Sequence, residues 1–132
     1  MTTVLFACIH NAGRSQMAAA FFNQMANSEK AAAISAGTQP AEQLHPEVIG
    51  TMGELGIDLR AVRPQLLTPE LSRTAHLLVT MGCGDECPFI TGVERQDWAL
   101  DDPKDKSAEQ VRQLRDDIKR RVAALVTSRG WG

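Results

Sequence analysis

The fold of this chain is decided by the stretch Val4-Leu5-Phe6-Ala7-Cys8-Ile9-His10-Asn11-Ala12-Gly13-Arg14-Ser15. Its first four residues are apolar and predict a buried strand over 3–7, and a helical pattern over 14–27 follows directly. A loop between a strand and a helix can point its N–H groups inward, and the helix N-terminus adds positive potential. The stretch therefore predicts a turn that binds an oxyanion.

Two side chains give this turn its chemistry. Arg14 offers a planar fork that matches the oxygens of a tetrahedral anion. The same field stabilises the thiolate of Cys8, which makes this cysteine a nucleophile at neutral pH. The alternative is a buried structural cysteine beside a surface arginine, but the flanking strand and helix favour the functional interpretation. We expect the anion to be bound by Ile9, His10, Asn11, Ala12, Gly13, Arg14 and Ser15.

Two residues of the loop are expected to support it. Asn11 holds the shape of a tight loop through side-chain bonds to the backbone. Ser15 either donates a hydrogen bond to the Cys8 thiolate or caps the helix. His10 is expected to face solvent, whereas His45 and His76 are expected to be structural.

Composition excludes several classes of protein. At 132 residues and a net charge of −2, we expect one domain over 1–132 and no nucleic-acid partner. No apolar run approaches membrane-spanning length, and no basic segment precedes the first strand, so we expect a cytoplasmic protein with no membrane partner. We also expect a monomer. The three cysteines are an odd number, which favours catalytic or redox thiols over a disulfide framework.

Strands and helices alternate along the chain. Strands are expected over 3–7, 32–36, 76–80 and 96–100. Helices are expected over 14–27, from His45 to Gly56 with Leu55 facing inward, after Thr68, and from Ser107, where Gln110 completes a capping box. The solvent-exposed face of the last helix is expected to carry Arg112, Arg115 and residues 119–121. This alternation predicts an α/β fold, with a parallel sheet covered by helices on both faces.

Three chemically important residues follow predicted strands. Active sites of such sheets lie beyond the carboxyl ends of the strands, so we expect Cys8, Cys83 and Asp102 to gather at one edge. A carboxyl group at Asp102 would protonate a leaving oxygen, and Pro103 would make its turn rigid. Cys83 and Cys87 share one loop and suit a thiol relay with Cys8. The alternatives are a zinc site completed by His10 or His76, which lacks the usual ligand spacing, and inert packing of small thiols.

Together these motifs resemble the low-molecular-weight protein tyrosine phosphatases, and most of all their arsenate reductase branch. The match runs along nearly the whole chain and includes Gln16-Met17 after the loop, Ser35-Ala36-Gly37, the Cys83/Cys87 loop, and Trp98 with Asp101-Asp102-Pro103. The resemblance implies a four-stranded parallel sheet that is flavodoxin-like in winding. Lys104 and Asp105 follow Asp-Pro, where the phosphatases usually carry aromatic residues.

The resemblance also implies a mechanism. Cys8 attacks arsenate bound in loop 8–15, and Asp102 protonates the departing oxygen. Cys83 then attacks Cys8 and releases arsenite, and Cys87 attacks Cys83, which leaves a disulfide that thioredoxin reduces. No cofactor or metal is bound. Several reductases of the branch hold a potassium ion through a glutamate where this chain has Ala19, so that cation is not predicted.

Three alternatives remain open at this point. The Cys83–Cys87 spacing is shorter than in the best-known three-cysteine members, so mycothiol or glutathione with a matching redoxin is an alternative reductant. A phosphotyrosine-type phosphatase is the alternative enzyme. A metalloid sensor that binds through its three thiols, without catalysis, is the alternative outside enzymes.

Overall fold

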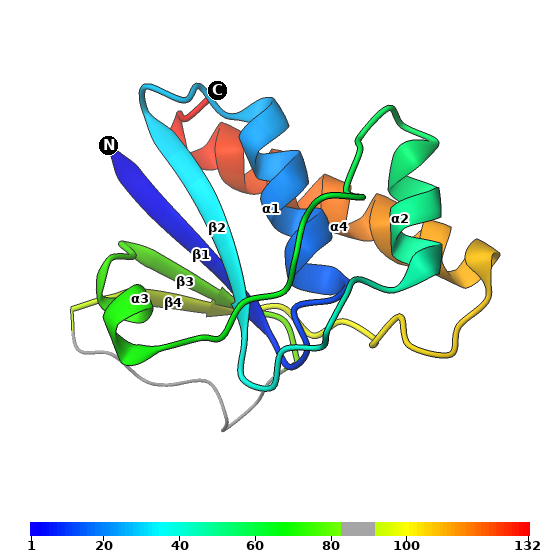
Figure 1. The fold of residues 1–132 in the computed structure, drawn as a ribbon. Coiled ribbons are helices and arrows are strands. Elements are labelled where there is room, and N and C mark those ends of the chain that lie inside the picture. The colour runs from blue at the N-terminus through cyan, green and yellow to red at the C-terminus, as the bar shows by residue number, and fades with distance from the viewer. Residues whose placement is uncertain (83–91) are drawn as a thin grey trace.

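A four-stranded parallel sheet in the order β2-β1-β3-β4 forms the centre of the molecule (Figure 1). This computed structural model describes residues 1–82 and 92–132. The strands are β1 (Thr2–Cys8), β2 (Ala31–Gly37), β3 (Leu77–Thr80) and β4 (Glu94–Asp97). The helices are α1 (Arg14–Met25), α2 (Pro46–Gly53), α3 (Pro69–Arg73) and α4 (Ala108–Arg129). The predicted α/β fold with a four-stranded parallel sheet is confirmed.

Alternate residues of β1 pack into two separate cores, as the period of a strand requires. Val4 and Phe6 belong to the larger core, which α1 and α4 cover. Leu5 and Ala7 belong to a smaller core on the opposite face, against which Leu71 of α3 packs. Figure 1 shows α1, α2 and α4 on one side and the short α3 on the other. Helices therefore cover both faces, as predicted, but unequally.

The fourth strand lies two residues earlier than the sequence predicts. β4 pairs with β3 from Glu94 to Asp97, whereas the apolar residues 98–100 were expected to form the end of the strand. β4 is an edge strand, so its exposed residues need no apolar pattern. Trp98 follows the strand: its N–H still donates to the Thr80 carbonyl at 2.8 Å, and its ring packs on Phe6, with centroids 5.8 Å apart. The apolar pattern thus reports the burial of Trp98 and misses the polar start of the strand.

Two further expectations about helices are corrected. α2 ends at Gly53, and Leu55, which was expected to face inward, is 38% exposed in the turn that follows. Arg115 was expected on the wet face of α4 but is buried, because its guanidinium donates to the Thr51 carbonyl and pairs with Glu54. The predicted capping box of α4 is present. No helix among the described residues is both long and apolar enough to cross a membrane.

Candidate active site

The loop between β1 and α1 turns its carbonyl groups outward. The carbonyls of Cys8, Ile9, His10 and Ala12 accept hydrogen bonds from backbone N–H groups of the segment 38–45, at 2.8 to 3.2 Å. Consecutive peptide groups that give their carbonyls to one side leave their N–H groups to the other. Within the described part of the chain, the N–H groups of residues 9–13 have no acceptor. The loop is therefore a set of unpaired donors, as an oxyanion site requires.

Asn11 holds the middle of this loop. It is fully buried and has a φ of 50°, in the left-handed region that asparagine tolerates. Its Oδ1 accepts from the backbone N–H of Gln65 at 2.9 Å and from Nε2 of Gln16 at 3.0 Å. Since a backbone N–H can only donate, the Gln65 contact fixes which way the Asn11 amide points. The bond to the Gln65 backbone is of the kind expected for Asn11, and the bond to Gln16 joins two side chains.

The Asn11 amide orients Ser15, which in turn contacts the cysteine. Asn11 Nδ2 donates to Ser15 Oγ at 2.7 Å, and Ser15 Oγ lies 2.9 Å from Cys8 Sγ. The hydroxyl oxygen accepts from Asn11 and keeps both its hydrogen and a second lone pair, so it can donate to the sulfur or accept from it. Cys8 is 2% exposed, so the hydroxyl contacts a sulfur that is nearly removed from water. The structure therefore places the Ser15 hydroxyl against a buried cysteine sulfur at the start of the loop.

Arg14 lies at the start of α1 with its guanidinium buried. Its Nη1 donates to the Leu100 carbonyl at 3.2 Å, and its Nη2 lies 3.8 Å from Asp102 Oδ2. The Nε atom is the one buried side-chain nitrogen or oxygen without a hydrogen-bond partner among the described residues. Gly82, at a φ of 97°, leaves the space that the guanidinium fills, since a Cβ there would overlap Nη1. The fork is thus held in place while one of its donors is unused.

Asp102 is presented to Arg14 by a compact turn. Its Oδ1 accepts from the backbone N–H of Lys104 at 3.0 Å, which leaves Oδ2 toward Arg14. Pro103 is buried although its neighbours are not, and its carbonyl accepts from Lys106 N at 3.2 Å. The structure thus brings Asp102 to the edge of the sheet where Cys8 and Arg14 lie, as the sequence predicts.

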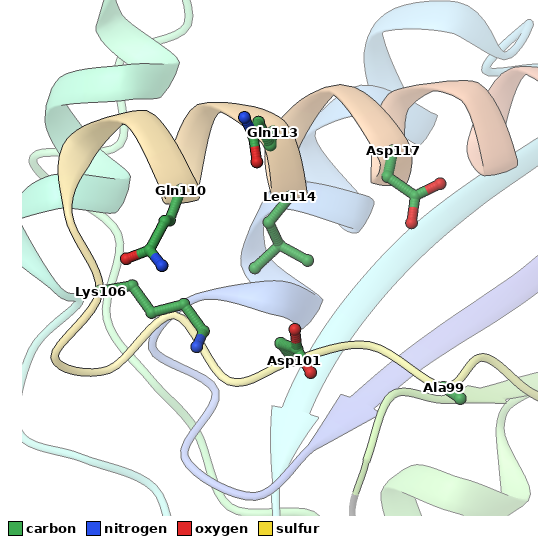
Figure 2. Close-up of a pocket in the computed structure, with 7 residues that line it drawn as sticks. All are labelled: Ala99, Asp101, Lys106, Gln110, Gln113, Leu114 and Asp117. Carbon is green, nitrogen blue, oxygen red and sulfur yellow. The ribbon is translucent and has the colours of Figure 1, made fainter.

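Asp101, the neighbouring acid, faces different surroundings. It lines a polar pocket of about 330 Å³ with Ala99, Lys106, Gln110, Gln113, Leu114 and Asp117. Figure 2 shows Gln110, Leu114 and Asp117 pointing from α4 toward the segment that carries Asp101 and Lys106. The Leu100 carbonyl between Ala99 and Asp101 accepts from Arg14, so this segment separates the pocket from the loop 8–15. Of the two acids, only Asp102 pairs with Arg14.

Of the remaining predicted site residues, the structure describes some and not others. Cys83 and Cys87 lie outside the described residues. His10 is half-buried, with its Nδ1 lying 3.1 Å from the Gln39 carbonyl. Within residues 1–82 and 92–132, no three His, Cys, Asp or Glu side chains form a group that could hold a metal ion.

Two supporting residues were not found by the sequence argument as parts of the site. Gln16 was noted only as part of the family's pattern, yet its Nε2 donates to both Asn11 oxygens. Gln65 stands 54 positions from Asn11, and its own Nε2 donates to the Ser35 carbonyl at 2.7 Å. No motif links a glutamine in an irregular segment to a loop so distant in sequence. Only the folded chain shows that contact.

The comparisons with known proteins agree with this geometry. Residues 3–129 match the family of low molecular weight phosphotyrosine protein phosphatases, and the chain belongs to that family. A Halobacterium salinarum protein provisionally named arsenate reductase is 39% identical over 124 residues, which cover 91% of this chain and 87% of that one. A glutaredoxin arsenate reductase from Synechocystis is 32% identical over 129 residues, covering 96% and 97%.

A solved structure extends the likeness to three dimensions. The thioredoxin-dependent arsenate reductase of Corynebacterium glutamicum is 37% identical and superposes with a TM-score of 0.84 over 97% of this chain. The chain spans 61% of the length of that protein. The family and the fold that the sequence resembles are thus both confirmed.

Proposed function

We propose that this chain reduces arsenate to arsenite, with Cys8 as the nucleophile. The observation that carries the proposal is the loop of unpaired N–H groups over residues 9–13, closed around a buried sulfur that is hydrogen-bonded to Ser15. Arg14 adds a free Nε donor to this set. Arsenate and phosphate have the same charge and shape, so the loop selects the class of anion, and the further thiols decide the reaction.

The first step forms a bond between sulfur and arsenic. The Cys8 thiolate attacks the arsenic of bound arsenate, one As–O bond breaks, and the oxygen leaves as water after Asp102 supplies a proton. Arsenic stays in the +5 state. The N–H groups and Arg14 stabilise the negative charge on the oxygens that remain. The turn that ties Asp102 Oδ1 to Lys104 keeps Oδ2 on the side of Arg14.

The second step transfers two electrons. The thiolate of Cys83 attacks Cys8 Sγ, so that an S–S bond forms and the S–As bond breaks with its electron pair left on arsenic. Arsenic leaves in the +3 state as arsenite. Cys87 then attacks Cys83, which regenerates the Cys8 thiolate and moves the disulfide to the pair Cys83–Cys87. The two thiols of the relay thus supply both electrons.

An external dithiol closes the cycle by reducing that disulfide and becoming oxidised itself. Thioredoxin is our first choice, because the Corynebacterium glutamicum relative depends on it. Mycothiol or glutathione with a redoxin is the alternative, since the Synechocystis relative is named for glutaredoxin. Free thiols of this kind persist in a reducing compartment, which favours the cytoplasm. No bound cofactor takes part.

A phosphotyrosine-type phosphatase is the second candidate, because it would use the same loop. Lys104 and Asp105 follow Asp102-Pro103 where an aromatic ligand would be flanked by rings, and Asp105 has a φ of 61°. A phosphate ester also needs no reductant, which leaves Cys83 and Cys87 without a task. Both features favour arsenate reduction.

The test is product analysis with purified protein, arsenate, thioredoxin, thioredoxin reductase and NADPH. The chain should form arsenite in step with NADPH consumption. Cys87→Ser should form one equivalent of arsenite and stop, whereas Cys8→Ser should form none. Hydrolysis of phosphotyrosine with no arsenite would establish the phosphatase instead, and arsenite binding without turnover would establish a metalloid sensor.

A further inference from the structure

Gly13 lies in direct contact with the turn that carries Asp102. A Cβ built on Gly13 would overlap Cγ of Pro103 and lie 3.4 Å from its Cδ and 3.5 Å from Cδ2 of His45. The proline ring thus occupies the volume that any side chain at position 13 would fill. The glycines of α2 differ, because a Cβ on Gly50 or Gly53 would meet nothing within 4 Å.

The contact joins the oxyanion loop to the acid turn. Gly13 is the residue before α1 and belongs to the loop, whereas Pro103 belongs to a turn about ninety positions away. Pro103 is buried between Asp102, which is half-buried, and Lys104, which is exposed, so its ring is the part of the turn that packs. The depth at which the ring rests on Gly13 fixes how closely the turn approaches the loop.

The turn transmits this depth to the carboxyl group of Asp102. Asp102 and Pro103 are adjacent, and Oδ1 of Asp102 is tied to the N–H of Lys104 on the other side of the ring. The proline ring also fixes its own φ, so the turn has little freedom to absorb a shift. Any outward movement of Pro103 therefore moves Oδ2 away from Arg14, from which it now lies 3.8 Å.

We propose that Gly13 is a positioning residue for proton donation: the missing side chain lets Pro103 seat against the loop and so places Asp102 over the departing oxygen. The inference rests on the proposed function, in which Asp102 donates that proton. It is separate from the part that the Gly13 N–H plays in binding the anion, because the two depend on different atoms. An alanine keeps the N–H and adds only the methyl group.

The expected effect is on the chemical step rather than on binding. Cγ of Pro103 would overlap the new methyl group and must withdraw by about 1 to 1.5 Å to reach ordinary carbon contact. A displacement of about 1 Å costs up to about 100-fold in rate. Gly13→Ala should therefore lower the single-turnover rate of arsenite formation by about 10- to 100-fold. Binding of inorganic phosphate should change by less than about 3-fold, since the N–H groups and Arg14 remain.

A double-mutant cycle separates a collision from general damage. Pro103→Ala removes Cγ and Cδ, the two nearest atoms that a methyl group at position 13 meets. If the collision is the cause, Gly13→Ala should cost little in the Pro103→Ala background, and the double variant should be no slower than Pro103→Ala alone. The proposal would be overturned if the rate loss of the double variant equalled the product of the losses of the two single variants. It would also be overturned if Gly13→Ala lost phosphate binding and rate equally. Should Gly13→Ala fail to fold, the comparison of the double variant with Pro103→Ala still decides.

The dependence of the rate on the leaving group gives a second measurement. General damage to the structure would slow all substrates equally and would not change this dependence. Phenyl phosphate needs a proton on its departing oxygen more than p-nitrophenyl phosphate does, so Gly13→Ala should slow the former more. Gly50→Ala is the matched control and should change neither rate. If the native chain forms no arsenite but shows this pattern with the two esters, the proposed function fails and the positioning role stands. If it forms arsenite but the losses multiply, the proposed function stands and the positioning role fails.

Discussion

The N-termini of α1 and α4 differ although both helices pack on the same face of the sheet. α4 begins with a complete capping box, in which Ser107 and Gln110 satisfy each other's backbone N–H groups. Glu109 lies in its first turn, and Gly130 ends it in the left-handed region. The N-cap residue of α1 is Gly13, which offers no side-chain cap, and the first turn of this helix has no acidic residue. The side chains of α4 thus accept hydrogen bonds at its N-terminus, whereas the N-terminus of α1 has no such side-chain acceptor.

The difference separates residues that stabilise the fold from residues that bind a ligand. A capped N-terminus gains about 1 kcal/mol, but its N–H groups are then no longer available. An uncapped N-terminus in a loop of unpaired donors keeps both its N–H groups and its positive potential for an anion. α1 compensates through burial, since its Met17, Phe21 and Phe22 are fully buried.

The largest effect is expected from changing the arginine at the open end of α1. Arg14→Lys keeps the charge but loses the planar fork, so the unpartnered Nε donor and the bond from Nη1 to Leu100 are both lost. We expect kcat/KM for arsenate to fall by about 10²- to 10³-fold, the usual cost of one preorganised oxyanion donor. Steady-state kinetics with thioredoxin measures this.

The matched control is an arginine at the other end of α4. Arg129 lies in the last turn, pairs with Glu94 and stacks on Trp131 at 5.7 Å. Arg129→Lys should leave arsenate kinetics within about 2-fold of the native chain, because lysine keeps the exposed charge pair. Equal losses of kcat/KM in Arg14→Lys and Arg129→Lys would show that the start of α1 has no special part in binding arsenate.

Inorganic phosphate should stabilise the open helix end by occupying it. At a concentration one hundred times Kd, the free energy of unfolding should rise by about 2.7 kcal/mol. Thermal unfolding with phosphate measures this against chloride of equal ionic strength, which controls for screening. The increase should shrink in Arg14→Lys and persist in Ser107→Ala. An equal increase in Arg14→Lys would mean that the anion binds elsewhere.

The sequence predicts the starts of α1 and α4 well, because both depend on local patterns. The start of α4 was predicted to the residue, because a capping box is local and Ser107 and Gln110 are three positions apart. The loop 8–15 was also predicted from a local pattern of strand, small residues and helix. Both depend on contacts between neighbours in the chain.

The contacts that hold the loop could not be predicted in this way. Gln65 reaches Asn11, and Pro103 reaches Gly13, only because the fold brings these segments together. The position of β4 was predicted two residues late, because an edge strand carries polar residues and the apolar run after it packs elsewhere. Periodicity reports which face is buried, and it does not report what a distant segment contributes.

A smaller effect is expected at the closed helix end. Ser107→Ala removes the hydroxyl that accepts from Gln110 N at 3.2 Å and should lower the free energy of unfolding by about 1 kcal/mol. Arsenate kinetics should stay unchanged, because this cap serves only the stability of α4. Ser107→Asn keeps an accepting oxygen at the cap and is the control. Urea unfolding measures both variants, and a loss of activity without loss of stability would contradict the division.

The smallest effect is expected where α4 meets α2, at Glu54. Hydrogen bonds from Arg112, and then from Arg115, lower the pKa of this carboxyl below its ordinary value of 4.5. A pKa that is lower in the folded state means that the unfolded chain binds more protons in this window, so stability rises with pH. The stability that the Glu54 carboxylate contributes is fully present above about pH 5. It is lost as the pH falls through 4.5 and then through the lower pKa of the folded chain. The native chain and Glu54→Gln should therefore differ in urea midpoint at about pH 7 and converge once the pH is well below the lowered pKa of Glu54. A constant difference would show that the charge has no part in joining α2 to α4.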